Sequence, residues 1–509
     1  MLNQNIRNLA LLIQDAVRRS PEAVFGTDKV SAPMADAFKT AQALCASMSG
    51  AILKGQTVAF VGVTSEHYLI FWMACQLHGV RTALINPHYP QDLIREMLLD
   101  LNPDAVAFFD DTYRAPTHPN WASIDARNAW SGHLVVKSAE IPRSGKSDVP
   151  VEGDALLTGL ACDGSEIACY MHTSGTSGRP KFCALSHSYF IRLGRFIADS
   201  LGYVRDDVVF APMPMFHINP LGYGVVAAWT AGAGVLGTQR FAAQNFWSTV
   251  KQIGATALVL HVTPLQMLMK EADVDASAGH KVRVVFGAIS EFLGMFGIPI
   301  GITAYGSTEA GGLCHTWHVR AGDRSLAEEG PTHYAGRVRF DAEFKISEEG
   351  EIHVRAREAD TLFSGYLRDG VLDPSTDADS WFHTGDRGRV DHLGNLVFIE
   401  RMSESIRVNG EYVPIDFVER SLEKEAELSE FAIWSRADTV SGQRVVLWIA
   451  DPRIDLEKTL AAIQRLPSIM RPVEIIQIAS LPRDTGVNKV QRRRLHDEHA
   501  LWRHEVSAQ

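Results

Sequence analysis

Short apolar runs that alternate with helical periods dominate the first 300 residues of this chain. The runs TVAFVGV (57–63) and AVAFF (105–109) have the length and the β-branched or aromatic content of buried strands. An amphipathic helix is expected from Tyr68 to His78. Further buried-strand candidates are ALVLHV (257–262), VRVVFG (282–287) and ITAYG (302–306). Strands that alternate with helices form parallel sheets covered by helices, so the pattern predicts a layered α/β architecture.

The pattern changes near residue 335, where shorter alternating runs lie between Gly- and Asp-rich corners. Antiparallel strands, and with them a β subdomain, are predicted at RVRFDAEFKI (337–346), GEIHVRA (350–356) and NLVFIER (395–401). After Arg401 we expect a short strand, a helix over 415–426, two strands, a helix from about 456 and a last strand. The predicted fold class is α/β, with a large N-terminal domain of layered α/β subdomains plus a β subdomain, and a small α+β C-terminal domain.

Length and charge restrict the class of protein. At about 100–200 residues per domain, 509 residues predict two to four domains or subdomains. We place the boundary at 401–404, between a large domain (1–401) and a small domain (404–509). The 49 basic residues against 60 acidic ones, a formal charge of −11, argue against a nucleic-acid-binding protein.

Three features favour a cytoplasmic protein without a membrane span. The N-terminal segment lacks the basic, apolar and cleavage regions of a secretory signal. The longest uncharged window, 208–239, is interrupted by Pro212, Pro214 and Pro220, so a continuous spanning helix is not expected. The 6 cysteines are sparse and unpatterned, as expected for reduced thiols.

The ten residues from His172 to Lys181, HTSGTSGRPK, form a segment rich in hydrogen-bond donors. Its glycines allow consecutive backbone N–H groups to turn toward an anion, while the hydroxyl groups and Lys181 add donors and a positive charge. This composition predicts a phosphate-binding loop, although the spacing differs from GxxxxGK[ST]. A solvent-exposed loop rich in turn residues is the alternative that this segment alone leaves open.

Five further segments follow this loop in order. They are MFHIN (215–219), AYGSTEAGG (304–312), WFHTGDRGRVD (381–391), ERMSESIRVNGEYVPIDFVE (400–419) and LPRDTGVNKVQRRRL (481–495). With these motifs the sequence resembles the adenylate-forming superfamily, which comprises acyl-CoA synthetases, luciferases and the adenylation domains of peptide synthetases. The resemblance runs from about Gly55 to Leu495 and is nearest to carnitine/crotonobetaine-type CoA ligases.

The resemblance implies an AMP-forming acid–thiol ligase that uses ATP, Mg²⁺ and CoA. A carboxylate would attack the α-phosphate of ATP and release pyrophosphate, and the acyl group would then pass to the thiol of CoA. Because two anions must meet, such a site has to neutralise charge and position the reactants. The small domain would be mobile and rotate between the two half-reactions, with its hinge at Ser403.

The same resemblance implies the catalytic residues. Lys489 would bridge the carboxylate and the α-phosphate, Thr308 would reach the α-phosphate, and Glu309 would hold Mg²⁺, which prefers oxygen ligands. His217 is a fourth catalytic candidate.

The resemblance also implies a nucleotide site. Tyr305 would stack on adenine, and Asp386, helped by Arg401, would accept the ribose hydroxyls. The full set of implied cofactor-binding residues is Thr173, Ser174, Gly175, Thr176, Ser177, Gly178, Lys181, Gly287, Ala288, Tyr305, Gly306, Ser307, Asp386, Arg401 and Gly410.

An acyl pocket is expected between the MFHIN segment and the strands that precede YGSTE. Its predicted lining is His217, Asn219, Tyr223, His261, Val262 and Gly312. No acidic residue occurs from 208 to 270 to pair with an α-amino group, so a simple organic acid is favoured over an amino acid.

Two departures from the family pattern leave alternative functions open. Ser403 stands where Asp or Lys is usual, and Asn488 lies in a TGVNK segment one residue longer than the common form. Both concern domain rotation, so the transfer step is less firmly implied than adenylation. One alternative is adenylation followed by transfer to an amine or to a carrier-protein thiol. Another is a nucleotide-binding homologue without catalytic activity.

Overall fold

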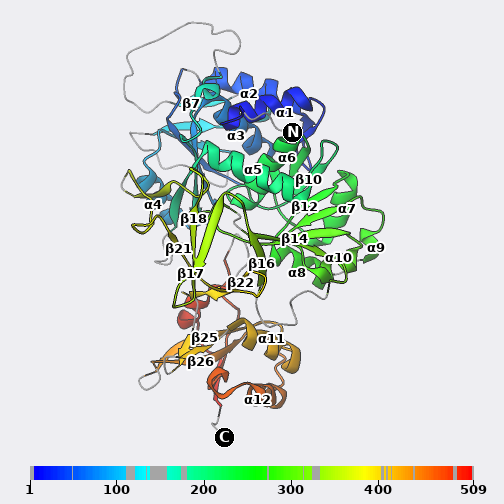
Figure 1. The fold of residues 1–509 in the computed structure, drawn as a ribbon, viewed down its shortest axis with the longest axis vertical. Helices are drawn as coiled ribbons and strands as arrows, with labels where there is room; N and C mark the ends of the chain where they lie inside the picture. Colours follow the sequence, from blue (N-terminus) through cyan, green and yellow to red (C-terminus); the bar gives the residue numbers. More distant parts are fainter. Residues whose placement is uncertain are drawn as a thin grey trace. The chain divides into compact units, whose positions relative to one another are not determined.

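The chain folds into two units of unequal size, seen in the computed structural model in Figure 1. The large unit comprises residues 1–323, 336–344 and 354–382, and the small unit comprises 324–335, 345–353 and 383–509. The structure describes residues 5–48, 50–110, 121–132, 134–137, 157–173, 180–271, 274–312, 315–323, 333–368, 370–402, 406–408, 411–413, 415–438, 442–484 and 490–506.

The first sheet of the large unit is parallel at its centre. Its parallel strands, in spatial order, are β1 (Val24–Thr27), β11 (Gly234–Gly237), β10 (Val208–Ala211), β12 (Ala257–Val259), β13 (Val284–Phe286) and β14 (Ile300–Tyr305). Antiparallel strands β2 (Ser31–Pro33) and β15 (His315–Arg320) flank them. The buried strands predicted after residue 250 are therefore present and parallel, as their near-continuous apolar content indicates.

The second sheet of the large unit is also parallel at its centre. Its central strands are β6 (Ala122–Asp125), β5 (Ala105–Phe108), β3 (Thr57–Val61), β4 (Arg81–Ile85) and β8 (Ile167–Thr173). Antiparallel strands extend it at both edges, namely β7 (Val135–Lys137) at one edge and β9 (Lys181–Ser186), β19 (Gly365–Arg368) and β20 (Val371–Asp373) at the other. This order brings β19, late in the chain, beside the loop-bearing pair β8 and β9.

Helices connect and cover these strands. They are α1 (Leu9–Arg19), α2 (Met34–Met48), α3 (Glu66–His78), α4 (Gln91–Leu101), α5 (His187–Leu201), α6 (Ala227–Ala231), α7 (Phe246–Gln252), α8 (Val262–Lys270), α9 (Val274–Ser277) and α10 (Ser290–Phe296). In Figure 1, α1, α2 and α3 lie together near the N-terminus. No described helix is both long enough and apolar enough to cross a membrane.

Helix α3 differs from the amphipathic helix predicted there. Every residue from Tyr68 to His78 is buried, because α3 packs against helices as well as against strands. The Phe71 ring stacks on Phe60 with centroids 5.1 Å apart, while Trp72 stacks on Trp229 at 5.7 Å. A helix that is buried on all faces carries mostly apolar residues on every side. The prediction that this helix is amphipathic is therefore wrong.

The small unit contains an α+β domain, in which two helices cover one face of a sheet. Its strands are β23 (Ile406–Val408), β24 (Glu411–Val413), β25 (Phe431–Asp438), β26 (Gly442–Ile449), β27 (Glu474–Gln477) and β28 (Trp502–Glu505), and its helices are α11 (Ile415–Ala426) and α12 (Leu456–Arg465). The core gathers Val418, Leu447, Ile463 and Ile475 between helices and sheet. The helix predicted over 415–426 is present with those bounds.

Antiparallel strands also occupy the predicted β region before the small-unit sheet. These are β16 (His333–Val338), β17 (Ala342–Ile346), β18 (Glu351–Ala356), β21 (Phe382–Val390) and β22 (Leu396–Arg401), of which β21 and β22 pair antiparallel. The hinge residue Ser403 lies outside the described residues, so the boundary at 401–404 stays a prediction.

Candidate functional site

The carboxyl ends of neighbouring parallel strands gather several of the predicted site residues. His261 follows β12, Gly287 and Ala288 follow β13, and Tyr305 closes β14. Because these strands are adjacent and parallel, their carboxyl ends meet at one edge of the sheet, which is where open α/β sheets bind ligands.

Gly287 allows the ends of two of these strands to approach closely. Its φ is +82°, and a Cβ atom there would lie 2.7 Å from the backbone oxygen of Leu260. Its N–H donates to the carbonyl of Ile302 at 2.8 Å, and Ala288 N–H donates to the same oxygen at 3.0 Å. A side chain at position 287 would therefore both strain the backbone and separate the strand ends.

Glu309 is held by two hydroxyl groups from different parts of the large unit. Thr173 Oγ1 donates to Glu309 Oε1 at 3.0 Å, and Tyr366 Oη donates to the same oxygen at 2.9 Å. The Glu309 residue is 9% exposed. Two neutral donors orient the carboxylate without neutralising its charge, so an oxygen-preferring cation such as Mg²⁺ fits this residue.

Tyr366 also lies beside the lysine of the predicted phosphate loop. Lys181 Nζ lies 5.0 Å from the centroid of the Tyr366 ring, within cation–π distance. Thr173 and Lys181 face each other in the β8–β9 ladder, so the loop that joins them begins and ends at this cluster. We call Thr173, Lys181, Glu309 and Tyr366 the phosphate-side cluster. Tyr366 was missed by sequence reasoning, because it lies 57 residues after Glu309 and belongs to none of the motifs.

Hydrogen bonds fix the turn that carries Thr308. Tyr189 Oη, from α5, donates to the Thr308 carbonyl at 2.9 Å. Ser307 Oγ accepts the N–H of Ala310 at 3.2 Å. Gly306 is exposed, whereas Tyr305 is buried at the end of β14. The YGSTE segment thus leaves the sheet edge as an ordered turn rather than a loose loop.

Three of the predicted acyl-pocket residues, Asn219, Tyr223 and Gly312, come together at an eight-residue π-helix, η4 (Asn219–Val226). Tyr223 Oη donates to the Gly312 carbonyl, and Asn219 Nδ2 donates to the Leu260 carbonyl at 3.2 Å. π-helical turns often occur at functional sites, where they redirect side chains. These two hydrogen bonds therefore link η4 to the end of β12 and to the turn at Gly312.

Two polar atoms of this region are buried without a hydrogen-bond partner among the described residues. They are Asn219 Oδ1 and His261 Nε2. Burial lowers the pKa of His261 to about 4, so its imidazole is neutral near pH 7. Buried polar atoms without partners are rare in proteins. A ligand with polar groups of its own would supply the hydrogen-bond partners that these two atoms lack.

The superfamily resemblance implies an aromatic residue at the position of His172, and the histidine there is buried. Burial, together with the neighbouring His217, lowers the pKa of His172 to about 3, so the ring is neutral. It stacks on Phe216 with centroids 5.9 Å apart and lies edge-on to His217 at 6.4 Å. Its Nε2 accepts the Asn86 N–H at 3.2 Å. A histidine at this position therefore keeps an aromatic ring packed against Phe216 and His217 and adds no charge.

In the small unit, the predicted ribose-binding residues form an ion pair. Asp386 and Arg401 are register partners on β21 and β22, and Arg401 Nε lies 2.9 Å from Asp386 Oδ1. The Asp386 side chain is 5% exposed, and that of Arg401 is 37% exposed. The Arg401 guanidinium therefore fixes the orientation of the Asp386 carboxylate, which the sequence motif alone does not determine.

Several predicted site residues cannot be placed. Those outside the described residues are Ser174, Gly175, Thr176, Ser177, Gly178, Ser403, Gly410, Asn488 and Lys489, and the side chain of Val262 is likewise not described.

Replacement of Tyr366 by Phe tests the phosphate-side cluster. A hydrogen bond to a charged group contributes about 1.5–3 kcal/mol, so we expect adenylation kcat/KM to fall about tenfold or more. Because Tyr366 acts by positioning Glu309, the Mg²⁺ concentration needed for half-maximal rate should rise. Tyr203→Phe is the matched control, since Tyr203 Oη is buried without a partner among the described residues. An unchanged Mg²⁺ dependence in Tyr366→Phe would contradict the positioning role.

Similarity to known proteins was found at the levels of family and sequence. The family model of the AMP-binding enzymes matches residues 13–367. The chain is 26% identical to the medium/long-chain-fatty-acid–CoA ligase FadD17 of Mycobacterium tuberculosis, over 69% of this chain and 71% of that protein. It is 27% identical to the crotonobetaine/carnitine–CoA ligase of Shigella sonnei, over 55% of this chain and 56% of that protein.

Solved structures share the fold over almost the whole chain. The o-succinylbenzoate CoA synthetase MenE of Bacillus subtilis, solved with its acyl-adenylate intermediate, superposes with a TM-score of 0.79 at 20% identity, covering 96% of this chain and 98% of that one. ATP-bound MatB of Rhodopseudomonas palustris gives a TM-score of 0.76 at 18% identity, with coverages of 96% and 98%. These similarities confirm the predicted fold class.

Proposed function

Because this chain belongs to the AMP-binding enzyme family, we propose that it is an AMP-forming ligase that activates a carboxylic acid with ATP and transfers the acyl group to CoA. The observation that carries this proposal is the phosphate-side cluster. Its members join the ends of the predicted phosphate loop to the glutamate of the YGSTE turn.

In the first half-reaction, a carboxylate oxygen of the acid attacks the α-phosphorus of ATP. The bond from the α-phosphorus to the bridging oxygen breaks, and pyrophosphate leaves. We assign Lys181 and the loop after Thr173 to the β- and γ-phosphates, and Thr308 to the α-phosphate. Glu309 would hold Mg²⁺, which supplies positive charge against the phosphate oxygens when it is bound. Preorganised charge of this kind is the largest contribution that the protein can make to this step.

The remaining nucleotide contacts are assigned from the superfamily resemblance. Tyr305 and the backbone at Gly287 and Ala288 would face the adenine, and Asp386 would accept the ribose hydroxyls while Arg401 orients it. Lys489, of the small unit, would bridge the acid and the α-phosphate. Rotation about the hinge at Ser403 would then exchange this lysine for the Gly410 segment before the thiol attacks.

In the second half-reaction, the sulfur of CoA attacks the acyl carbon, the carbon–oxygen bond breaks, and AMP leaves. CoA is favoured as the acceptor because FadD17 and the crotonobetaine/carnitine enzyme are both CoA ligases by name. Transfer to an amine or to a carrier-protein thiol is the second candidate, because Ser403 and Asn488 depart from the family pattern at positions that govern domain rotation.

The acceptor can be tested by supplying the enzyme with ATP, Mg²⁺ and a panel of acids, together with CoA, amines or a phosphopantetheinylated carrier protein. We expect the acyl-CoA thioester as the product, formed in equal amounts with AMP. Formation of an amide or of an acyl-carrier protein, without acyl-CoA, would show that CoA is not the acceptor. The assignment of the adenylation step would still hold.

The acid is proposed to carry polar groups beside its carboxylate. Asn219 Oδ1 and His261 Nε2 are buried near the predicted pocket and lack partners among the described residues. A wholly apolar acyl chain would leave both atoms unsatisfied, whereas a hydroxyl or amide N–H of the substrate would donate to Asn219 Oδ1, and a second polar group would pair with His261 Nε2. Because His261 is neutral, a cationic group is not repelled there.

Replacement of Asn219 by Leu should therefore change the preferred acid rather than abolish activity. We expect kcat/KM for polar acids to fall about tenfold or more, the effect of losing a paired polar group, while apolar acids of similar length improve or stay unchanged. For each protein, the kcat/KM for a polar acid is divided by the kcat/KM for an apolar acid. A defect in folding or in ATP binding lowers both values equally and leaves this ratio unchanged. A uniform loss for both classes of acid would contradict the proposed contact.

We place the protein in the cytoplasm, where ATP and CoA are available. In support, the five cysteines of the described residues are buried thiols: Cys45, Cys75, Cys162, Cys169 and Cys183. Burial raises the pKa of Cys45 and of Cys169 to about 12, so these thiols are unreactive structural groups. Unpaired thiols of this kind are typical of a reducing compartment.

A further inference from the structure

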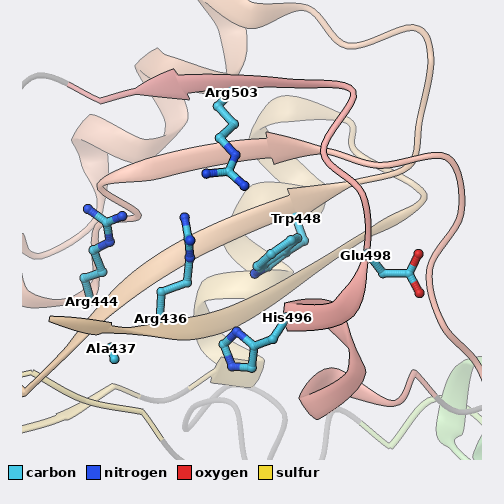
Figure 2. Close-up of a pocket in the computed structure, with 7 residues that line it drawn as sticks. All are labelled: Arg436, Ala437, Arg444, Trp448, His496, Glu498 and Arg503. Carbon is cyan, nitrogen blue, oxygen red and sulfur yellow. The ribbon is translucent and has the colours of Figure 1, made fainter.

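The small unit contains a cavity of about 460 Å³ that no step of the proposed reaction uses. Figure 2 shows it on one face of the sheet, with arginine and tryptophan side chains directed from the strands and His496 from the 3-10 helix η9 (Arg492–Asp497). Its lining residues are Arg436, Ala437, Arg444, Trp448, His496, Glu498 and Arg503. The volume lies within the range of about 300–1,000 Å³ that is typical of small-molecule sites.

Strand register explains why these side chains share a face. Arg436 on β25 is the register partner of Arg444 on β26, and Trp448 follows Arg444 by four residues on the same side of the strand. Trp448 pairs with Ile476 of β27, and Ile476 pairs with Arg503 of β28. Leu447 and Ile475 point to the opposite face, into the core. Three strands, β25, β26 and β28, thus contribute basic or aromatic side chains to this face, and β27 lies between β26 and β28.

Two buried N–H groups of this cavity have no partner among the described residues. Trp448 is only 2% exposed, yet its Nε1 makes no hydrogen bond, and the Nε of Arg444 is likewise buried without a partner. His496 accepts the Trp434 Nε1–H at Nε2, at 3.2 Å, so its own proton lies on Nδ1. Buried donors without acceptors call for a ligand that supplies acceptors.

The charges of the cavity favour an anion. Glu474, 2% exposed, accepts from Arg436 at 3.2 Å and pairs with Arg444 at 2.9 Å, so one carboxylate serves two guanidinium groups. Arg503 is exposed and has no hydrogen bond or ion pair to any other side chain of the described residues. In Figure 2 its guanidinium is directed over the sheet toward the other arginines, whereas the Glu498 carboxylate is directed away from them.

We propose that this cavity binds a phosphorylated small molecule, with the phosphate group received by Arg503, Arg444 and the Trp448 indole N–H. Arginine forks match the geometry of phosphate oxygens, and the positive charge of Arg503, which has no acidic partner among the described residues, favours an anion over a neutral ligand. A bare phosphate ion would fill only a small part of the volume, so the ligand is a phosphomonoester with an organic portion. This site is independent of the catalytic assignment, since none of its residues belongs to the proposed active site.

The full-length protein should be titrated calorimetrically with adenosine 3′,5′-bisphosphate, AMP, CoA, dephospho-CoA and inorganic phosphate. The variants are Arg503→Gln and the control Arg453→Gln, whose side chain is 87% exposed and does not line the cavity. We expect Arg503→Gln to weaken binding of at least one phosphomonoester about tenfold to a hundredfold, the range for a hydrogen bond to a charged group. Arg453→Gln should bind like the wild type.

The pattern of losses identifies the source of the phosphate. A loss for CoA and the 3′,5′-bisphosphate, but not for dephospho-CoA or AMP, assigns the site to the 3′-phosphate of CoA. A loss for AMP as well assigns it to free phosphorylated metabolites. Trp448→Phe removes the indole N–H together with the fused pyrrole part of the ring system, and should weaken binding of the same ligands about fivefold, as for one neutral hydrogen bond. Equal affinities of wild type, Arg503→Gln and Trp448→Phe for every probe would overturn the proposal, whether or not adenylation is observed.

Discussion

Replacement of Glu309 by Gln is expected to lower the rate of adenylation by about a hundredfold or more. The change keeps the shape of the side chain and its contacts with Thr173 and Tyr366, which lie 3.0 and 2.9 Å from Oε1. It removes the negative charge that would hold Mg²⁺, and loss of one preorganised electrostatic contact costs about 10²–10³ in rate. The measurement is acid-dependent pyrophosphate exchange as a function of Mg²⁺ concentration.

Glu291→Gln is the matched control, because Glu291 is exposed on α10 of the same unit and has no assigned role. It should show wild-type rates and wild-type dependence on Mg²⁺. If Glu309→Gln and Glu291→Gln were equally active, Glu309 would not be the metal ligand, and the phosphate-side cluster would be a structural hydrogen-bond network.

Replacement of Lys489 by Ala is expected to lower adenylation by about a hundredfold or more, while transfer from a supplied acyl-adenylate to CoA is reduced far less. The lysine charge would offset the repulsion between carboxylate and phosphate in the first step only, if the proposed rotation removes it before the second. Separate assays of the two half-reactions measure this split.

Lys458→Ala is its control, a lysine of the same unit that pairs with Glu427 at 2.8 Å on the surface. An equal loss in both half-reactions of Lys489→Ala would indicate a general defect of the small unit. Unchanged adenylation would show that another cation bridges the two anions.

The sequence predicted those parts of the fold that have a local signature. The buried strands β3, β12, β13 and β14 could be recognised from unbroken β-branched runs, and α11 from its helical period. The superfamily resemblance rested on ordered motifs, and the family match over residues 13–367 confirms it. The amphipathic assignment of α3 failed because enclosure by α1 and α2 is a tertiary property that no local window contains.

The candidate site could be predicted only where its residues belong to a motif. Thr173, Lys181 and Glu309 were recognisable in this way, and the structure brings them together through Tyr366, which was not. Tyr366 reaches the cluster because β19 pairs with β9, a contact between segments almost 200 residues apart. The cavity at Arg503 was missed for the same reason, since β28 reaches the face of β25 and β26 only through its pairing with β27.

The central claim is acid activation by adenylate formation, and ATP–pyrophosphate exchange tests it most directly. The purified protein is incubated with ATP, labelled pyrophosphate and Mg²⁺, with and without each member of a panel of carboxylic acids that includes polar ones. We predict exchange that requires both an acid and Mg²⁺, and that is largest for an acid bearing polar groups. Binding of ATP without exchange for any acid would contradict the claim and favour a nucleotide-binding homologue without catalytic activity.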